Sequence, residues 1–331
     1  MGGRRLDWLA LGGIAWLVTG LFLDGWAHTN RLPDSFWTVW HAIFYSGYVA
    51  LSAVVLGAIA VRRPRVGSWR AAIPDGYGAA TAGVVAFGIG GILDMLWHTR
   101  FGVEVGNDAL LSPSHLTLGL GLFLLVSGPL LADLRRRDES ASLAHRLPAV
   151  LSITATFMLL TFFTMYSGPY SNFLGASGNG TSSDRLFRGL LGMFLFSGFI
   201  GGLLLMVLRR TTLPVGSITL VLGLDGTAMI LMGSRDTPLD AQLSFSAVAV
   251  LAGIAGDVLL WWLRPSAARP LALRTLVTIL PMAYFTLYLA VVGARYGYGW
   301  TMPFLTGSVV LCGAVGLLLS FVAMPPAAPS A

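Results

Sequence analysis

Ten apolar runs, each long enough to form a membrane-spanning helix, follow one another along the 331 residues of the chain. A helix needs about 20 mostly apolar residues to cross the hydrocarbon core of a bilayer. The runs therefore predict an all-α, polytopic integral membrane helix bundle with about ten transmembrane helices. The expected spans are 8–28, 36–61, 77–97, 114–134, 147–167, 186–208, 214–233, 242–263, 274–294 and 303–323.

The composition agrees with a membrane protein. Only 11% of the residues are charged and 55% are hydrophobic, with a mean hydropathy of +0.75, whereas soluble proteins carry about 25% charged residues. These values exclude a soluble enzyme, a disordered chain and a nucleic-acid-binding domain. The net charge of +6 would indicate a polyanionic partner for a soluble protein, but here the positive residues sort by membrane side. We expect the lipid bilayer as a partner and no nucleic acid.

The arginines predict the orientation of the bundle. All 21 basic residues are arginine, and fifteen of them fall on one side of the ten-span arrangement. Because loops on the cytoplasmic side are enriched in basic residues, we expect both termini in the cytoplasm. Arg4 and Arg5 lead directly into the first span, which indicates a retained first helix rather than a cleaved signal. The six arginines expected on the outer side are Arg31, Arg100, Arg185, Arg188, Arg235 and Arg295.

Two absences narrow the possible chemistry. Cys312 is the only cysteine, and the chain contains no lysine. A single cysteine excludes a disulfide framework and any zinc or iron–sulfur site built from thiolates. The lack of lysine excludes a retinal Schiff base, a phosphate-loop lysine and other lysine-based covalent chemistry.

Four of the five histidines occur in a pattern of one aspartate and two histidines that appears twice. In the first copy, Asp24 and His28 stand near the outer end of the first expected helix, and His41 stands near the start of the second. Residues four apart lie on one face of a helix, one turn from each other. The returning helix is antiparallel and adjacent because its loop is short, so the three side chains can converge.

The second copy consists of Asp94 and His98 on the third expected helix and His115 on the fourth. Ser112-Pro113 resembles a helix cap followed by proline in the first helical position, which places His115 in the first turn. In the first copy, Asp34 or Ser35 can cap the returning helix, which would place its histidine about one turn deeper.

Each hairpin can thus offer two imidazoles and one carboxylate to a metal ion and leave coordination positions open for water or substrate. These ligand types suit zinc or iron(II) as well as copper. Aspartate and histidine at membrane helix ends can also contact headgroups, cap helices or bond only to each other. The repetition of the triple and the cost of ionisable groups inside a membrane favour a functional site.

The second copy, Asp94-Met-Leu-Trp-His98 through Asp108-Ala-Leu-Leu-Ser-Pro-Ser-His115, resembles a known metal-binding segment. The segment belongs to a membrane subunit of the copper-dependent membrane monooxygenases, the methane and ammonia monooxygenase family. It has an aspartate, a tryptophan before a histidine, an acidic residue and then Ser-His after proline. The first copy matches the spacing of the family more closely, with twelve residues between His28 and His41.

This resemblance implies copper as the metal, with zinc or iron as alternatives from the ligand types alone. The implied ligands are Asp24, His28 and His41 in the first copy and Asp94, His98 and His115 in the second. The family's enzymes contain other subunits, so additional membrane subunits or a homo-oligomer are implied as partners. The similarity covers only 24–41 and 94–115, and the soluble cupredoxin-like portion of the family is missing. It therefore supports a metal site more directly than an oxygenase.

Three further carboxylates are candidates for orienting the metal ligands or relaying protons. Asp225 falls in the middle of the seventh expected span, and Asp34 and Asp108 fall in the outer loops of the two hairpins. An ionisable residue inside a membrane span indicates function by default. Asp257, toward the cytoplasmic end of the eighth span, is expected to make a structural hydrogen bond, although it could also mark a polar path across the membrane.

The predicted organisation is a four-helix unit of two metal-binding hairpins over 1–136, a six-helix membrane scaffold over 147–323 and a short cytoplasmic tail over 324–331. The leading hypothesis is a metal-dependent membrane oxygenase that acts on a small or lipophilic substrate, placed as a multi-pass protein in a prokaryotic cell membrane. The alternative is a non-catalytic metal transporter, sensor or assembly factor. A third is a scaffold subunit without stoichiometric metal.

Overall fold

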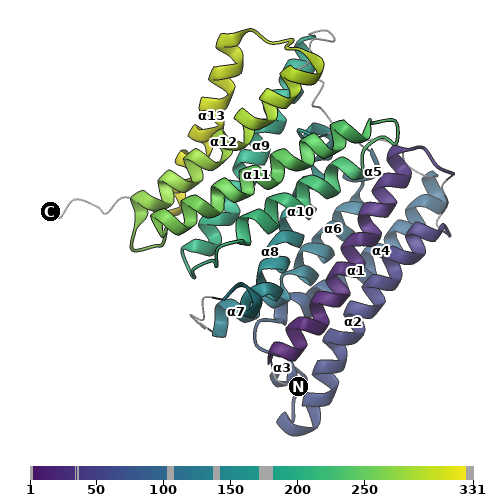
Figure 1. Cartoon of the computed structure of the whole chain (residues 1–331). Helices are drawn as coiled ribbons and strands as arrows, with labels where there is room; N and C mark the ends of the chain where they lie inside the picture. The colour runs from purple at the N-terminus through teal and green to yellow at the C-terminus, as the bar shows by residue number, and fades with distance from the viewer. Residues whose placement is uncertain are drawn as a thin grey trace. The chain divides into compact units, whose positions relative to one another are not determined.

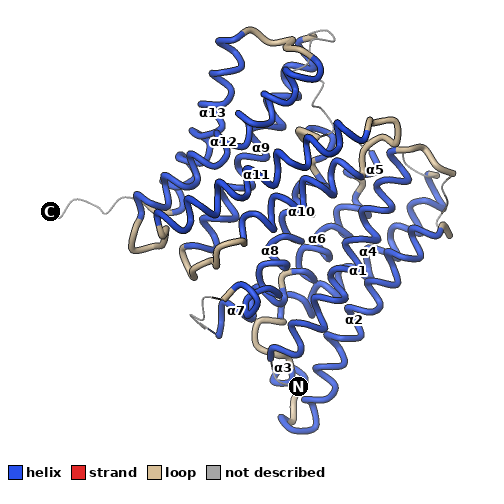
Figure 2. The backbone as a smooth tube through the Cα atoms, in the orientation of Figure 1, coloured by secondary structure: helices blue, strands red, loops and turns tan. Residues whose placement is uncertain are grey.

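The structure, a computed structural model, describes residues 3–33, 35, 37–102, 108–136, 142–170 and 182–325. Apart from one isolated bridge between Ser266 and Arg269, the regular structure in these ranges is entirely helical (Figure 2). The helices are α1 (Gly3–Thr29), α2 (Val39–Val66), α3 (Trp69–Ala72), α4 (Gly78–Phe101), α5 (Asp108–Leu111), α6 (Pro113–Val126), α7 (Gly128–Arg136), α8 (Leu143–Phe163), the 3-10 helix η1 (Met165–Ser167), α9 (Ser183–Leu208), α10 (Ser217–Leu231), α11 (Leu239–Leu263), α12 (Pro270–Tyr296) and α13 (Met302–Ala323).

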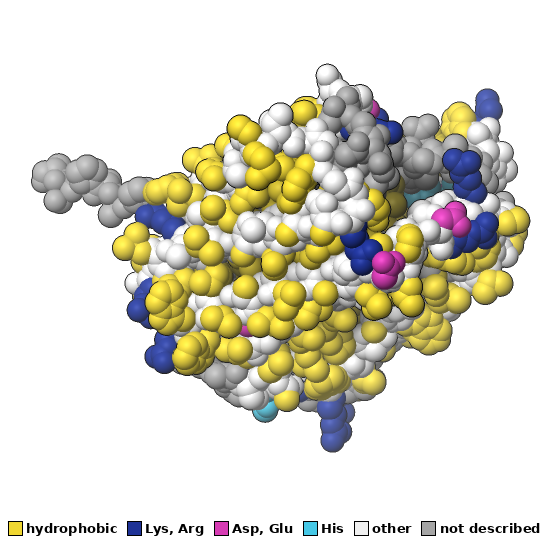
Figure 3. Space-filling view, turned by 45° about the horizontal axis from the view of Figure 1, so that its top comes forward, with side chains coloured by type: hydrophobic (Ala, Val, Ile, Leu, Met, Phe, Trp, Pro, Cys, Tyr) yellow, Lys and Arg dark blue, Asp and Glu magenta, His cyan; other side chains and the backbone are white. Residues whose placement is uncertain are grey.

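Within the described ranges, nine spans are long and apolar enough to cross a membrane, with α6 and α7 together forming one of them. This confirms the predicted polytopic helix bundle. Large apolar side chains are exposed on the protein surface, among them Val85, Leu120, Trp262 and Leu318. Figure 3 shows apolar side chains spread over much of the displayed face. Such a surface requires lipid rather than water as its surroundings.

The tenth predicted span, 214–233, corresponds to the shorter helix α10, with 15 residues. At 1.5 Å per residue this helix is about 22 Å long, less than the hydrocarbon core of about 30 Å. It begins only at Ser217, because Pro214 lacks an amide donor and Gly216 adopts a positive φ of 98°. The count of helices that can span alone, in the described ranges, is therefore nine rather than ten.

A side chain from the neighbouring helix α11 completes the start of α10. One carboxylate oxygen of Asp257 accepts the backbone N–H of Ile218 at 3.1 Å, and the other accepts the N–H of Thr219 at 2.9 Å. The hydroxyl of Thr219 also donates to Asp257 at 2.6 Å. The first N–H groups of a helix have no partner within the helix, and Asp257 supplies one from outside. The structural hydrogen bonding expected for Asp257 is thus present.

The chain divides into two compact units. The first contains residues 1–140, 144–159 and 231–235, and the second contains 141–143, 160–230 and 236–331. The first unit therefore includes most of α8 in addition to the predicted 1–136. Within it, α1 packs along α2 and α4 packs along α6 (Figure 1), so the two predicted hairpins are formed. Most of the predicted tail, 326–331, lies outside the described residues.

The break between α6 and α7 has a specific cause in the first unit. Pro129, the second residue of α7, cannot donate an amide hydrogen bond and interrupts the helix. The Ser152 hydroxyl from α8 donates to the carbonyl of Val126 at 2.5 Å and accepts the N–H of Leu130 at 3.3 Å. These two backbone groups would pair directly in an unbroken helix. Ser152 satisfies both of them, as buried backbone in a membrane requires.

Buried ion pairs join the helices of the first unit at the end where the chain begins. Asp7 on α1 accepts from the hydroxyl of Tyr77 at 2.8 Å and from Arg136 at 2.5 Å. Asp133 on α7 accepts from Arg146 on α8 at 2.6 Å, and both side chains are buried. Charged groups are buried where they are paired, so these contacts fix α1, α7 and α8 to one another.

Candidate metal centres

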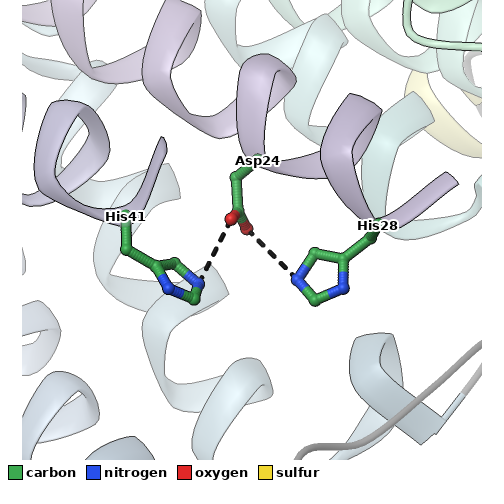
Figure 4. A group of neighbouring side chains, drawn as sticks. All are labelled: Asp24, His28 and His41. Carbon is green, nitrogen blue, oxygen red and sulfur yellow. Dashed lines mark ion pairs between the residues drawn. The ribbon is translucent and has the colours of Figure 1, made fainter. Parts of the chain in front are cut away.

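The first predicted triple converges at the end of the first hairpin. Figure 4 shows the carboxylate of Asp24 on α1 between the imidazoles of His28 and His41. Oδ1 of Asp24 lies 3.2 Å from Nε2 of His41, and Oδ2 lies 3.8 Å from Nε2 of His28. One nitrogen of each imidazole and one carboxylate oxygen lie within 4.8 Å of one another. The spacing in the sequence predicted this convergence.

The second triple forms an equivalent group at the same end of the second hairpin. Oδ1 of Asp94 on α4 lies 3.4 Å from Nε2 of His98, one turn further along α4, and 3.5 Å from Nε2 of His115 on α6. The centroids of the two imidazole rings are 5.6 Å apart. The carboxylate is buried, and its side chain is only 6% exposed. This group is the more enclosed of the two.

The returning helix of each hairpin presents its histidine from the third helical position. His41 follows the N-cap Thr38 by three residues, and His115 follows the N-cap Ser112 by three residues. The hydroxyl of each cap lies against Nδ1 of its histidine, at 3.0 Å for Thr38 and 2.7 Å for Ser112. A hydroxyl three residues before each histidine is thus a further part of the repeated pattern.

The predicted start of the second helix is wrong in its position. Asp34 or Ser35 was expected as the cap, with His41 about one turn inside the helix, whereas α2 begins at Val39 with Thr38 as its N-cap. Ser35 instead offers its backbone carbonyl to Nδ1 of His41 at 2.9 Å. His41 therefore occupies the first turn, as His115 does. Asp34 lies outside the described residues.

The hydrogen bonds of the histidines define which ring nitrogen carries the proton. A backbone carbonyl can only accept, so the contacts of His41 Nδ1 with Ser35 and of His98 Nδ1 with Gly102, at 3.2 Å, place hydrogen on Nδ1. In the neutral ring, Nε2 then carries a lone pair. This lone pair is directed at a carboxylate in both sites, and two electron-rich atoms repel unless a cation or a second proton lies between them.

The distances within each triple fit a shared metal ion. Two ligand atoms about 2.1 Å from a tetrahedral metal are about 3.4 Å apart, and the four Nε2–carboxylate separations run from 3.2 to 3.8 Å. Hydrogen bonds between nitrogen and oxygen are about 2.7–3.2 Å long, shorter than three of these four separations. Oδ1 of Asp94 is buried and accepts no hydrogen bond from the described part of the chain. The residues therefore fit a metal ion.

Glycines bring the two helices of each hairpin into backbone contact near the sites. A Cβ atom on Gly20, four residues before Asp24, would lie 2.5 Å from Cα of Phe44. A Cβ atom on Gly90, four residues before Asp94, would lie 2.9 Å from the backbone nitrogen of Leu118. Any side chain larger than hydrogen would separate the helices. Small residues allow such close approach in membranes, and here the approach places a carboxylate beside the partner's imidazole.

The glycine pattern continues on the returning helices. Gly47 stands six residues after His41, and Gly121 stands six residues after His115. A Cβ atom on Gly47 would lie 2.7 Å from the backbone of Leu17, and one on Gly121 would lie 2.6 Å from the backbone of Phe87. The duplication therefore extends well beyond the six ligand candidates and includes the surfaces along which the helices pack.

The other predicted carboxylates are placed less informatively. Asp108 is the first residue of α5, but its side chain lies outside the described part. Asp225 on α10 is fully buried in the second unit and accepts the hydroxyl hydrogen of Thr161 at 2.5 Å. That hydrogen bond involves none of the six metal-ligand candidates, so a role for Asp225 in orienting ligands or relaying protons stays a prediction.

Three residues near the sites were not predicted. Thr38 and Ser112 orient the histidines, and a hydroxyl three residues before each returning histidine was the available signal. Tyr45 stands one turn after His41 on α2, with its ring centroid 6.4 Å from that of His41. It interacts electrostatically with the carboxylates of both hairpins. No signal in the sequence distinguishes Tyr45 from other aromatic residues, because its neighbours come from another hairpin.

Comparisons with known proteins add no family to this description. No family model matches the chain, and neither the curated proteins nor the solved structures contain a significant match. The fold and the two Asp/His/His groups therefore define the chain as a polytopic membrane protein with two candidate metal centres. What the centres do must be argued from their own geometry.

Proposed function

We propose that this chain is a membrane metalloenzyme that holds one copper ion in each hairpin and oxidises a small or lipophilic substrate. Asp24, His28 and His41 would hold the first ion. The second ion would be held by Asp94, His98 and His115. The bound metal would supply the redox chemistry of a monooxygenase, and the protein residues would bind, orient and enclose it.

One observation carries the metal assignment. His41 and His98 each use Nδ1 to donate to a backbone carbonyl and direct Nε2 toward a carboxylate. Histidines that bind metals almost always donate their second ring N–H to a carbonyl, carboxylate or water, which fixes the ring and the tautomer. A pair that bonded only to itself would instead require protonated imidazoles around each aspartate.

The ligand set supports catalysis over structural metal binding. Structural zinc sites are closed by four protein ligands, whereas catalytic sites have three and keep a position for water or substrate. Each hairpin provides three ligands, and two histidines with one carboxylate is the set used by iron(II) oxygenases. His28 and His115 are 35% and 27% exposed at their side chains. A substrate dissolved in the outer leaflet could thus approach both sites.

Copper rests on the resemblance of 24–41 and 94–115 to the copper-dependent monooxygenases. Iron or zinc in the purified protein would keep the metalloprotein and change the metal. The metal transport alternative has lost one of its supports, because Asp257 is occupied as the cap of α10. A carboxylate that accepts three hydrogen bonds for a structural purpose is a poor element of an ion path.

The metal content of the full-length protein, purified in detergent without chelator, tests the proposal. Inductively coupled plasma mass spectrometry should find about two copper ions per chain, one for each three-ligand site. His28→Ala and His98→Ala should each lose about one ion. His145→Ala is the matched control, because His145 is an exposed histidine of α8 and belongs to neither triple. It should keep both ions.

A parent protein without stoichiometric metal would overturn the proposal, and so would His28→Ala and His98→Ala proteins that keep full metal content. Two ions of zinc or iron would replace copper while retaining the sites. Enzyme activity is tested separately with the copper-loaded protein in lipid vesicles, by oxidation of a short-chain hydrocarbon. Activity that survives in both histidine variants would contradict the catalytic role.

A further inference from the structure

Tyr45 is placed between the two candidate metal sites. It belongs to α2, the helix that provides His41, and it follows that histidine by four residues. Residues four apart share a helix face, so an ion held by His41 fixes the turn that carries Tyr45. The phenol hydroxyl makes a side-chain hydrogen bond with Asp94 of the other hairpin. A residue on one ligand helix therefore contacts a ligand on another.

The surroundings of Tyr45 hold its ring in this position. Its ring centroid lies 5.5 Å from that of Phe44 and 6.0 Å from that of Phe87 on α4. A Cβ atom on Gly91, three residues before Asp94, would lie 3.3 Å from the ring and 3.8 Å from the hydroxyl. Glycine at this position leaves the space in which the phenol reaches α4.

The duplication shows that Tyr45 is not part of the repeated pattern. The position equivalent to Tyr45 in the second hairpin, four residues after His115, is Gly119. The position equivalent to Gly91 in the first hairpin, three residues before Asp24, is Leu21. The second hairpin therefore offers no tyrosine back to the first. One bridging residue and its receiving glycine were added to an otherwise repeated structure, which is unexpected if packing were its only role.

We propose that Tyr45 couples the two metal sites by holding the Asp94 carboxylate from the helix that carries His41. The inference rests on the proposed function, because it requires metal in both hairpins. Tyr45 acts as a positioning residue and not as a ligand. An ion in the first site orders His41 and the following turn of α2, and the ordered hydroxyl then fixes Asp94 for the second ion. Because the ordering cost is met once, the second ion binds more tightly when the first site is filled.

A double-mutant cycle measures this coupling directly. The dissociation constant of the second site for Cu(II) is determined by chelator competition on the full-length protein in detergent. Four proteins are compared: the parent, His28→Ala, Tyr45→Phe and the double variant. His28→Ala empties the first site from α1 and leaves α2 unchanged. Coupling between sites typically amounts to roughly 5–150-fold in affinity.

The expected result is that His28→Ala weakens the second site at least about 5-fold when Tyr45 is present and less than about 2-fold in the Tyr45→Phe background. Tyr48→Phe is the matched control. Tyr48 lies one turn closer to the middle of α2 than Phe44, stacks on Phe87 at 4.4 Å and donates to the carbonyl of Val84 at 2.8 Å. Because these contacts involve no ligand candidate, its variant should retain the full coupling.

An equal effect of His28→Ala with and without Tyr45 would overturn the coupling, and so would an equal loss of coupling in Tyr48→Phe. Repulsion between two ions is present in both backgrounds and cancels in the cycle. Thermal unfolding of Tyr45→Phe and Tyr48→Phe verifies that both variants fold. A parent protein that binds no Cu(II) overturns the proposed function itself. Two ions with additive effects overturn only the role of Tyr45.

Discussion

Oδ1 of Asp94 lies 3.5 Å from Nε2 of His115, although the two residues come from different helices and only one of them is fully buried. The backbone contact between α4 and α6 brings them together, and Ser112 turns the imidazole toward the carboxylate. The separation is longer than most hydrogen bonds and matches two ligands of one ion. Substitutions at the residues that create this relationship should therefore change metal binding.

The first prediction concerns the hydroxyl that orients His115. Ser112→Ala removes the bond to Nδ1 of His115 and should weaken the second site for Cu(II) by about 10–100-fold, the usual effect of losing a residue that orients a ligand. Chelator competition measures this change. Ser68→Ala is the control, because Ser68 also caps a helix, α3, by accepting from Ala71. Equal metal affinity in the two variants would assign Ser112 to capping alone.

The second prediction concerns the glycine contact between α4 and α6. Gly121→Ala inserts a methyl group against the backbone of Phe87 and should cost about 1–3 kcal/mol of unfolding free energy by overpacking. It should also move Asp94 and His115 apart and reduce metal content by about one ion per chain. Gly57→Ala is the control, because nothing lies within 4 Å of its added Cβ. Full metal content in Gly121→Ala would contradict the proposed importance of the contact.

The third prediction concerns the cap of α10. Asp257→Ala leaves buried backbone N–H groups of Ile218 and Thr219 unpaired and should lower the free energy of unfolding by about 3 kcal/mol. Denaturant unfolding in detergent micelles measures the loss. Asp240→Ala is the comparison on the same helix, because Asp240 is 71% exposed in its pair with Arg295, and exposed pairs contribute about 0–1 kcal/mol. Equal losses in the two variants would be inconsistent with the cap.

The fourth prediction concerns the buried pair at the opposite end of the first unit. Arg146→Met leaves Asp133 buried without its partner and should cost about 3–5 kcal/mol, and Asp133→Leu added to it should restore most of this loss. The exposed pair of Arg188 and Asp184 provides the control, because Arg188→Ala should cost less than about 1 kcal/mol. A double variant as unstable as Arg146→Met would show that the charges act through other neighbours.

Much of the fold and both triples could be predicted from the sequence for simple physical reasons. A bilayer demands about 20 apolar residues for each spanning helix, so the runs themselves define the elements. The helical period places Asp24 with His28, and Asp94 with His98, on one face. A short loop then makes the partner helix adjacent. These constraints are local and do not depend on how other helices pack.

The features that were missed depend on contacts between distant segments. The start of α2 at Val39 was not predicted because several residues before it can cap a helix, and the backbone of Thr38, with ψ of 161°, decides the choice. The short helix α10 depends on Asp257, which comes from the next helix. The bridging position of Tyr45 depends on Gly91 in another hairpin. In each case the partner is fixed only once the chain has folded.

The glycine contacts imply that the width of each candidate centre is set by main-chain atoms, which are the same whatever the sequence. Side chains facing the lipid can therefore vary widely during evolution without altering the gap that an ion must fill. The same rigidity would make the centres intolerant of larger cations, since the helices can neither approach more closely nor separate without losing their contact. Selectivity by size would thus be a property of the backbone itself.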